Sequence, residues 1–127
     1  MNVIKEISAF KKLPSNLPIK QAKINSKDVK KNDIFFAIKG KKNDGNKFVQ
    51  QSFKKKASLA IVNRIHNNLN KSYQIKVKDS LKFLTECSKA FRNNINTKII
   101  AITGSCGKTT LKELLGNSLK SMFKVSI

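Results

Sequence analysis

The sequence predicts an α/β protein, in which a small α/β unit is followed by the opening strand, glycine loop and helix of a second, incomplete domain. Strand, helix and strand candidates with their own apolar faces alternate over residues 19–77. An apolar run, a glycine-containing turn and a leucine-bearing segment then follow one another between residues 98 and 119. The length of 127 residues gives room for one ordinary domain or two small ones, which excludes a complete large enzyme.

The first expected elements are a short helix, a loop and two strands. The apolar residues at helical spacing near the N-terminus are Ile4, Ile7 and Phe10. Pro14 and Pro18 prevent that helix from continuing. Apolar and polar residues alternate loosely over residues 19–29, and residues 33–38 form a Phe-rich apolar run, so we expect a strand in each segment.

A turn, a helix and a third strand come next. The triplet Asn43-Asp44-Gly45 is a turn signal. The segment after it is typical of an amphipathic helix, with apolar residues on one side of Gln and Lys. Those apolar residues are Phe48, Val49 and Phe53. The run Leu59–Val62 then predicts a short buried strand.

The remaining part of the first unit is expected to be a loop and a strand. Residues 63–70 are rich in asparagine and predict an exposed loop, in which His66, the only histidine, is solvated. Residues 73–77 alternate in polarity and predict the last strand of this unit.

A helix over residues 81–97 is expected to link the two domains. Asp79 or Ser80 can cap its first turn. The residues of its inner face recur every three to four positions, at Leu81, Leu84, Cys87 or Ser88, and Phe91. The segment before this helix, residues 1–80, is expected to fold by itself.

The composition limits the classes of function. The formal net charge is +20, and lysine supplies 25 of the 27 positive charges, although arginine is favoured for bidentate contacts to bases and phosphates. Lys, Asn and Ile make up 53 of the 127 residues, as A/T-rich coding sequence produces, so the charge is weak functional evidence. A small basic nucleic-acid-binding protein is therefore a second hypothesis, and the lysines, spread over every predicted element, disfavour nucleic acid as the partner.

Membrane insertion and secretion are also disfavoured. The longest uninterrupted apolar run is residues 34–38, and the N-terminus has no apolar signal region. The two cysteines, Cys87 and Cys106, are expected to be reduced thiols of a cytoplasmic protein.

The segment with the clearest chemistry begins at an apolar strand candidate, residues 98–103. It runs into Gly104-Ser105-Cys106-Gly107-Lys108-Thr109-Thr110, and then into a helix with apolar residues at Leu111, Leu114, Leu115 and Leu119. In a phosphate-binding loop, glycines let the backbone approach the phosphate, helix N–H groups point at it and lysine adds a full charge. A threonine directly after the lysine can bind Mg²⁺. The first glycine is three residues before Gly107 instead of five, so the strict phosphate-loop pattern is not met.

Two regions of the chain, in the family's order, resemble the Mur ligase family: an N-terminal set of three stretches and a later loop. The loop at residues 102–110 resembles the family's T-G-[ST]-N-G-K-T-T phosphate loop, with Cys106 in place of the usual Asn. Three earlier stretches resemble the family's D-S-R, G-D-[IL]-F-x-A-[IL]-x-G and D-G-x-x-F signatures: Asn25-Ser26-Lys27, Asp33 to Gly40, and Asp44-Gly45 with Phe48. Lys112-Glu113 after the double threonine is most similar to members that add D-alanyl-D-alanine to a UDP-N-acetylmuramoyl tripeptide. Members that add diaminopimelate or lysine are the nearest competitors.

The resemblance implies an ATP-dependent amide ligase of peptidoglycan precursor synthesis. In this family MgATP phosphorylates the carboxylate of the UDP-sugar peptide, and an amine then attacks the acyl phosphate. By this resemblance, the backbone amides that would bind ATP phosphates are those of Gly104, Ser105, Cys106 and Gly107. Lys108 would hold the outer phosphates, Thr109 would reach Mg²⁺ and Thr110 would assist. The segment that would contact the uridine end of the substrate is Asn25-Ser26-Lys27, which has Asn for Asp and Lys for Arg.

The resemblance also divides the chain into three parts. It implies a UDP-sugar-peptide-binding domain over residues 1–80, a linking helix over residues 81–97, and the start of the central ATP-binding domain over residues 98–127. Because the chain corresponds to the first third or less of such an enzyme, we expect it to be inactive alone, and to be monomeric. A UDP-sugar-binding module without catalysis is the third hypothesis.

Overall fold

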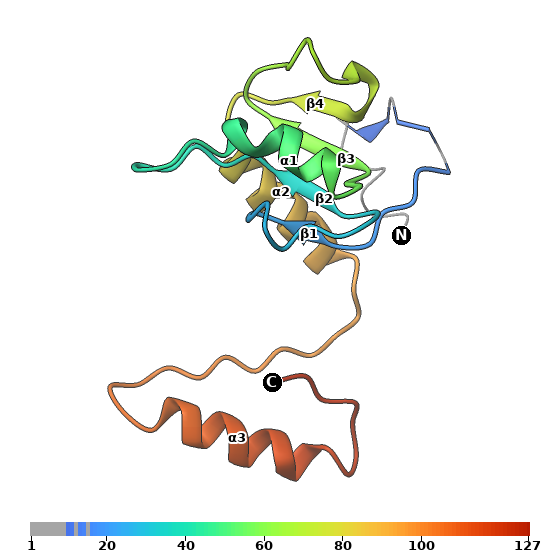
Figure 1. Cartoon of the computed structure of the whole chain (residues 1–127). Helices are drawn as coiled ribbons and strands as arrows, with labels where there is room; N and C mark the ends of the chain where they lie inside the picture. Colours follow the sequence, from blue (N-terminus) through green and yellow to red (C-terminus); the bar gives the residue numbers. More distant parts are fainter. Residues whose placement is uncertain (1–9, 12, 15) are drawn as a thin grey trace. The chain divides into compact units, whose positions relative to one another are not determined.

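The computed structural model describes residues 10, 11, 13, 14 and 16–127, and the chain forms two compact units (Figure 1). The first unit ends at Ile95 and the second extends from Asn96 to Ile127. The expected N-terminal helix with Ile4 and Ile7 lies outside the described residues, whereas Phe10 is buried in the core.

The first unit is a four-stranded, all-parallel sheet. Its strands, in spatial order, are β1 (Ala22–Lys23), β2 (Ile34–Phe36), β3 (Leu59–Val62) and β4 (Gln74–Lys76). The parallel sheet with its helices confirms the α/β class. Strand β1 is much shorter than the expected strand over residues 19–29, because the chain turns at Asn25, where the carbonyl accepts a hydrogen bond from the N–H of Asp28 at 3.1 Å.

One helical layer covers each face of this sheet (Figure 1). The 3₁₀ turn η3 (Gly45–Phe48) leads into α1 (Val49–Lys54) on one face, and α2 (Ser80–Asn93) covers the other. A second 3₁₀ turn, η4 (Lys71–Tyr73), precedes β4. The helix predicted after the Asp44-Gly45 turn is thus confirmed, and so is the cap by Asp79, whose side chain accepts hydrogen bonds from the N–H groups of Leu81 and Lys82.

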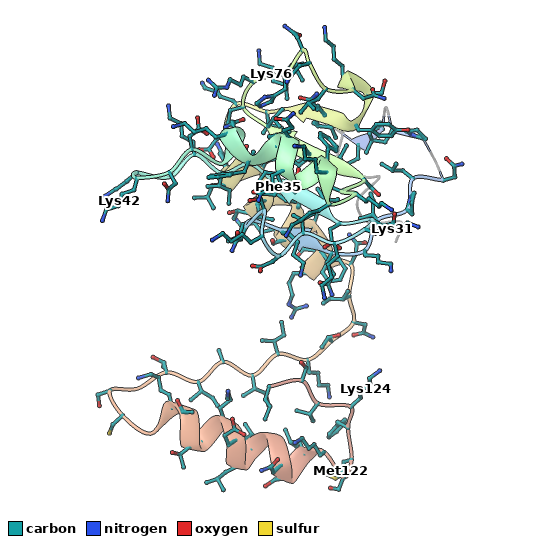
Figure 2. The ribbon with its side chains drawn as sticks, in the orientation of Figure 1. Lys31, Phe35, Lys42, Lys76, Met122 and Lys124 are labelled. Carbon is teal, nitrogen blue, oxygen red and sulfur yellow. The ribbon has the colours of Figure 1, made fainter. Side chains whose placement is uncertain are left out.

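Alternate residues of the central strands point to opposite faces, so the sheet has two apolar cores. The core beneath α2 contains Phe10, Ile34, Phe36, Leu59, Ile61 and Phe83. The core beneath α1 contains Val29, Phe35, Ala37, Val49, Ala60 and Val62. Strands that are apolar on both sides are what a parallel sheet covered on both faces requires. In Figure 2, Phe35 lies within the first unit while Lys31, Lys42 and Lys76 project from its periphery at separate places.

Helix α2 belongs to the first unit by its packing. The ring of Phe83 lies 5.6 Å from that of Phe10 and 6.5 Å from that of Phe36, between ring centroids. Leu84 and Cys87 pack against the same core. The compact first unit therefore includes the helix that the sequence placed between two domains.

The connection from β3 to β4 is a loop that a buried glutamine organises. The side-chain amide of Gln74 donates to the carbonyls of His66 and Asn70 at 3.0 and 3.2 Å, and its oxygen accepts from the N–H of His66 at 2.9 Å. Ile65 and Leu69 pack onto the core beneath α1. The prediction of a solvated His66 is wrong: its side chain is half-buried, and Nε2 is buried without a hydrogen-bond partner among the described residues, because the loop folds against the sheet.

The second unit contains one helix, α3 (Lys108–Leu119), as the leucine spacing predicted. The strand expected at residues 98–103 does not form: no residue from 96 to 127, all of which the structure describes, is in a strand. Ile99 and Ile100 are 61% and 60% exposed. A strand needs a neighbour for its N–H and C=O groups, and residues 96–127 supply none. Residues 124–127 are irregular as well.

Candidate functional site

The loops that follow the four parallel strands meet at the carboxyl edge of the sheet. In open α/β sheets, ligands bind in the crevice outside the carboxyl ends of the strands. Here those loops carry the Asn25-Ser26-Lys27 turn after β1, the Asp44-Gly45 turn after β2 and Asn63 directly after β3. The structure therefore brings the Asn25-Ser26-Lys27 and Asp44-Gly45 stretches to one edge of one sheet.

The Asn25-Ser26-Lys27 turn is fixed to α1. The Asn25 side-chain oxygen accepts a hydrogen bond from the N–H of Lys27 at 3.0 Å, a local turn that Asp could make equally well. The hydroxyl of Ser26 is buried and donates to Oε1 of Gln51 at 2.7 Å, and the ammonium of Lys55 donates to the carbonyl of Lys27. Ser26 is thus engaged inside the protein, while the side chains of Asn25 and Lys27 are exposed.

Residues 38–45 form a tight projection that we call the lysine hairpin. The N–H of Gly40 donates to the carbonyl of Asn43 at 2.8 Å, and the N–H of Gly45 donates to the carbonyl of Ile38 at 2.9 Å. A Cβ on Gly45 would lie 2.7 Å from the backbone N and O of Ile38, so only glycine fits there. The hairpin tip carries exposed Lys41 and Lys42, and Lys42 projects away from the sheet in Figure 2.

Asp44 anchors the base of the hairpin. Its Oδ1 accepts hydrogen bonds from the backbone N–H of Asn46 at 2.9 Å and from the Asn46 side chain at 2.7 Å. Nη2 of Arg64 lies 3.8 Å from its Oδ2. The hydrogen bonds from Asn46, with smaller contributions from Arg64 and Lys39, lower the pKa of the Asp44 carboxyl, and partial burial opposes them.

Asn46 and Asn63 form a reciprocal amide pair behind this hairpin. The side-chain Nδ2 of Asn46 donates to Oδ1 of Asn63 at 3.1 Å, and the N–H of Asn63 donates to Oδ1 of Asn46 at 3.0 Å. Nδ2 of Asn63 donates to the carbonyl of Lys78 at 3.1 Å, and the hydroxyl of Ser80 donates to its Oδ1 at 3.3 Å. The pair thereby joins the ends of β2, β3 and β4. These two asparagines are not distinguished in the sequence from the twelve others. Their positions, one after the Asp44-Gly45 turn and one directly after β3, are the signal that could have identified them.

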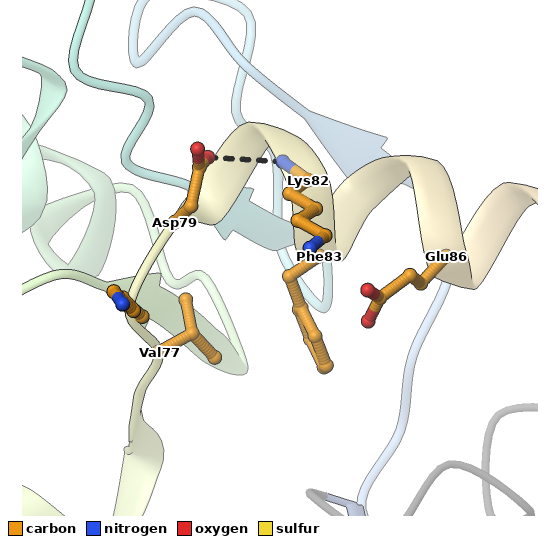
Figure 3. A pocket seen from close by; sticks show the side chains of 6 residues that line it. Val77, Asp79, Lys82, Phe83 and Glu86 are labelled. Carbon is orange, nitrogen blue, oxygen red and sulfur yellow. Dashed lines mark hydrogen bonds between the residues drawn. The ribbon is translucent and has the colours of Figure 1, made fainter.

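A pocket of about 500 Å³ lies beside the first turns of α2 (Figure 3). Its lining residues are Val77, Lys78, Asp79, Lys82, Phe83 and Glu86. The carboxylate of Asp79 is engaged with the N–H groups of the first helical turn, as the dashed line in Figure 3 shows for Lys82. None of the residues that the sequence predicted for substrate or ATP lines this pocket.

The predicted phosphate loop lies in the second unit, at the N-terminus of α3. Gly107 precedes the helix with φ +74°, a left-handed conformation that favours glycine. The first intrahelical bond runs from the N–H of Leu111 to the carbonyl of Gly107 at 2.9 Å, so the N–H groups of Lys108, Thr109 and Thr110 precede the helical ladder. Every residue from Gly104 to Thr110 is exposed.

The lysine of this loop folds back on it. The ammonium of Lys108 donates to the carbonyl of Gly104, at the other end of the loop. Cys106 is a free, exposed thiol between the two glycines. The loop has the residue types and the helix N-terminus that an anionic phosphate group requires, whereas the strand that would support it is not formed.

Two further observations concern membranes and metals. Among the described residues, no helix has the length and apolar character needed to cross a bilayer. The part of the chain that the structure describes contains no group of three or more His, Cys, Asp or Glu side chains placed to hold a metal ion.

Comparison with known proteins identifies the family. The model of the Mur ligase family, catalytic domain, matches residues 18–98. UDP-N-acetylmuramoyl-tripeptide–D-alanyl-D-alanine ligase from Rickettsia prowazekii is 39% identical over 105 residues, which are 83% of this chain and 23% of that protein. UDP-N-acetylmuramoyl-L-alanyl-D-glutamate–2,6-diaminopimelate ligase from Clostridium tetani is 34% identical over 117 residues, 87% of this chain and 24% of that protein.

Solved structures show the same likeness. MurF ligase from Thermotoga maritima in complex with ADP matches with a TM-score of 0.70 and 32% identity, over 86% of this chain and 25% of that chain. A crystal structure of MurF from Acinetobacter baumannii matches with a TM-score of 0.77 and 30% identity, over 97% of this chain and 27% of that chain. The chain thus spans about a quarter of the length of these relatives. Its sequence motifs, its parallel sheet and the match over residues 18–98 place the chain in the Mur ligase family.

Proposed function

We propose that the chain is part of an ATP-dependent ligase of peptidoglycan precursor synthesis, which adds D-alanyl-D-alanine to a UDP-N-acetylmuramoyl tripeptide in the cytoplasm. The observation that carries this proposal is the family match over residues 18–98. The relative from Rickettsia prowazekii and the MurF structures support the D-alanyl-D-alanine reaction. The relative from Clostridium tetani supports the alternative, addition of diaminopimelate to the dipeptide precursor.

In this proposal the first unit binds the nucleotide end of the precursor at the carboxyl edge of its sheet. Asn25 and Lys27 present exposed side chains there, while Ser26 secures their turn to α1 through Gln51. The lysine hairpin adds Lys41 and Lys42 at the neighbouring loop. A diphosphate group carries the negative charge that such lysines attract, and loops on a rigid sheet are a usual place for binding residues.

The second unit, residues 96–127, would contribute the phosphate loop for ATP. The backbone N–H groups of residues 104–107 and the start of α3 would surround the phosphates, with Lys108 exchanging its bond to the Gly104 carbonyl for a phosphate oxygen. Thr109 would hold Mg²⁺ together with phosphate oxygens, and Thr110 lies in the same helical turn. Bound MgATP supplies the phosphoryl group that activates the precursor carboxylate. The phosphate loop at residues 104–110 is exposed and has no flanking strand. We therefore expect the 127-residue chain to bind MgATP weakly and to be inactive alone.

Calorimetric titration tests the proposed substrate. The chain is titrated with UDP-N-acetylmuramoyl tripeptide, with the corresponding dipeptide precursor and with UDP. The proposal is supported if the tripeptide precursor binds, if Lys27→Ala weakens this binding, and if Lys89→Ala on the exposed surface of α2 leaves it unchanged. Tighter binding of the dipeptide precursor favours the diaminopimelate reaction, and no binding of any of the three contradicts a nucleotide site in this chain.

Protection of Cys106 tests the phosphate loop separately. Alkylation of the exposed thiol is followed by mass spectrometry with and without millimolar MgATP. Slower alkylation with MgATP, abolished by Lys108→Ala and retained in Lys112→Ala, supports the loop as the ATP site. If saturating MgATP leaves the alkylation rate of Cys106 in the unmodified chain unchanged, ATP does not bind at this loop.

A further inference from the structure

We propose that Asn46 and Asn63 are positioning residues of the nucleotide-binding edge: their amide pair holds the lysine hairpin in place without touching the ligand. This inference rests on the proposed function for the identity of the ligand, and on the geometry of the pair for everything else. Asn46 is 2% exposed, so its side chain is out of reach of a ligand at the surface.

Asn46 has its hydrogen-bonding groups directed to protein partners. The two hydrogens of its Nδ2 go to Asp44 at 2.7 Å and to Asn63 at 3.1 Å, and its Oδ1 accepts from the Asn63 backbone at 3.0 Å. A buried amide with all of these groups satisfied specifies one arrangement, because any displacement leaves a buried polar group without a partner. The pair therefore defines a single relative placement of the loops after β2 and β3.

Asn63 extends this placement to the end of β4. Its Nδ2 donates to the carbonyl of Lys78 at 3.1 Å and of Val77 at 3.4 Å, and its Oδ1 accepts from Ser80 at the start of α2. Backbone carbonyls beyond the last residue of a parallel strand have no ladder partner, and here the Asn63 side chain supplies one. One asparagine thus supports three neighbouring loops at the carboxyl edge.

The lysine hairpin depends on this support at its base. Asp44 is the last hairpin residue before Gly45, and its carboxylate is held by Asn46 on one side and faces Arg64 on the other. The hairpin itself has few internal bonds: the Gly40 to Asn43 bond and the Gly45 to Ile38 bond, which together form the antiparallel bridge between Lys39 and Asp44. Without the Asn46 side chain, the Asp44 carboxylate keeps the bond from the Asn46 backbone N–H but loses the bond from Nδ2, and the loop after β3 loses its link to the hairpin. We expect Lys41 and Lys42 to lose their defined position as a result.

Hydrogen exchange in the unmodified chain gives the first test. We expect the side-chain amide protons of Asn46 and Asn63 to exchange at least about tenfold more slowly than those of exposed Asn67 and Asn68, because hydrogen-bonded amides are protected. Equal exchange in all four asparagines would overturn the pair. This measurement requires no substitution, so it holds even where a variant fails to fold.

Substitution gives the second test, with Asn46→Ala, Asn63→Ala and the milder Asn63→Ser compared with Asn67→Ala as the matched control. In the folded variants, we expect the Gly45 N–H to exchange at least about tenfold faster, while the Ala37 N–H bonded to Ile61 is unchanged. The affinity for UDP-N-acetylmuramoyl tripeptide, measured below the unfolding transition, should fall about tenfold, equivalent to the loss of one good hydrogen bond.

The outcomes separate the inference from the proposed function. If the unmodified chain binds the nucleotide and the folded Asn46 and Asn63 variants bind it equally well, the positioning role is overturned. The proposed function is then left intact. If the unmodified chain binds no nucleotide, the proposed function is overturned. Faster exchange of the Gly45 N–H in the variants would still show that the asparagine pair stabilises the hairpin. Unchanged Gly45 exchange in a folded variant overturns the inference whatever the nucleotide does.

Discussion

The ring of Phe83 on α2 lies 6.5 Å from the ring of Phe36 on β2, which joins the last helix of the first unit to the centre of its sheet. Phe83 is 8% exposed and contacts Phe10 as well. The core beneath α2 is therefore incomplete in a chain that ends near residue 80. This contact leads to the first prediction.

Removing Phe83 should destabilise the first unit. We expect Phe83→Ala to lower the free energy of unfolding by about 3 kcal/mol, because a large buried ring is lost and a cavity remains. Leu81→Ala on the exposed side of the same helix, where the side chain is 55% exposed, should change it by less than about 0.5 kcal/mol. Denaturant unfolding measures both variants.

The same contact predicts where the chain can be divided. A chain ending at residue 95 should unfold cooperatively, whereas one ending at residue 79 should show a weak transition or none, because it loses Phe83 and the helix over it. Thermal melting followed by circular dichroism distinguishes the two. Equal cooperativity in both chains would contradict the structural role of α2 and support residues 1–80 as a domain that folds by itself.

Lys56 should be a site where glycine stabilises the protein. It follows the end of α1 with φ +65°, and its N–H donates to the carbonyl of Phe53 at 2.9 Å. A side chain at a left-handed position after a helix is unfavourable, so we expect Lys56→Gly to raise the free energy of unfolding by about 0.5 to 1 kcal/mol. Lys54→Gly, inside the helix, should lower it by about the same amount. A Lys56→Gly variant less stable than the unmodified chain would contradict the assigned backbone conformation.

Asp44 should make stability fall at acid pH. Its pKa is lowered in the folded chain from the usual 3.8, chiefly by hydrogen bonds from Asn46. The folded state therefore prefers the carboxylate, so the stability that Asp44 contributes is fully present above about pH 3.8 and is lost as the pH falls toward the lowered pKa. Between pH 6 and pH 2, Asp44→Asn should lose less stability than the unmodified chain, and Asp28→Asn at an exposed carboxylate is the control. Parallel pH profiles for all three would contradict the role of Asp44.

The two cysteines should differ in reactivity. Burial, followed by the negative charge of Glu86, raises the pKa of the Cys87 thiol to about 11, whereas Cys106 is exposed in the glycine loop. The thiolate is the reactive form, so iodoacetamide at pH 8 should modify Cys106 at least about tenfold faster than Cys87. Unfolding in denaturant should bring the two rates together. Equal rates in the folded chain would place Cys87 outside the core beneath α2.

The elements that local sequence specifies were predicted well. The runs at Ile34–Phe36 and Leu59–Val62 are apolar at every position, which a parallel strand covered on both faces requires, and the structure has β2 and β3 there. Asp79 and Ser80 were the two predicted caps of α2, and Asp79 is the cap, because its carboxylate reaches the N–H groups two and three residues ahead. Such signals depend only on near neighbours in the chain.

The strand at residues 98–103 shows the limit of that reasoning. Its apolar pattern is that of a buried strand, yet Ile99 and Ile100 are largely exposed, because residues 96–127 offer no strand to pair with. His66 shows the opposite error: its polar surroundings in the sequence predicted solvent, while the buried amide of Gln74 draws its backbone onto the sheet.

The sequence by itself determined the α/β class, the order of the central strands and helices, and the motifs of the Mur ligase family, because periodicity, capping and glycine turns act over a few residues. Only the tertiary structure decided that Asn46 meets Asn63 across 17 positions of chain, that Ser26 is engaged by Gln51, and that α2 completes the first core. Those contacts arise where parallel strands bring their carboxyl ends together. Hydrogen bonds between such distant residues produce no periodic pattern in the sequence. A polar residue that will form one cannot be distinguished, from the sequence alone, from a polar residue that will face solvent.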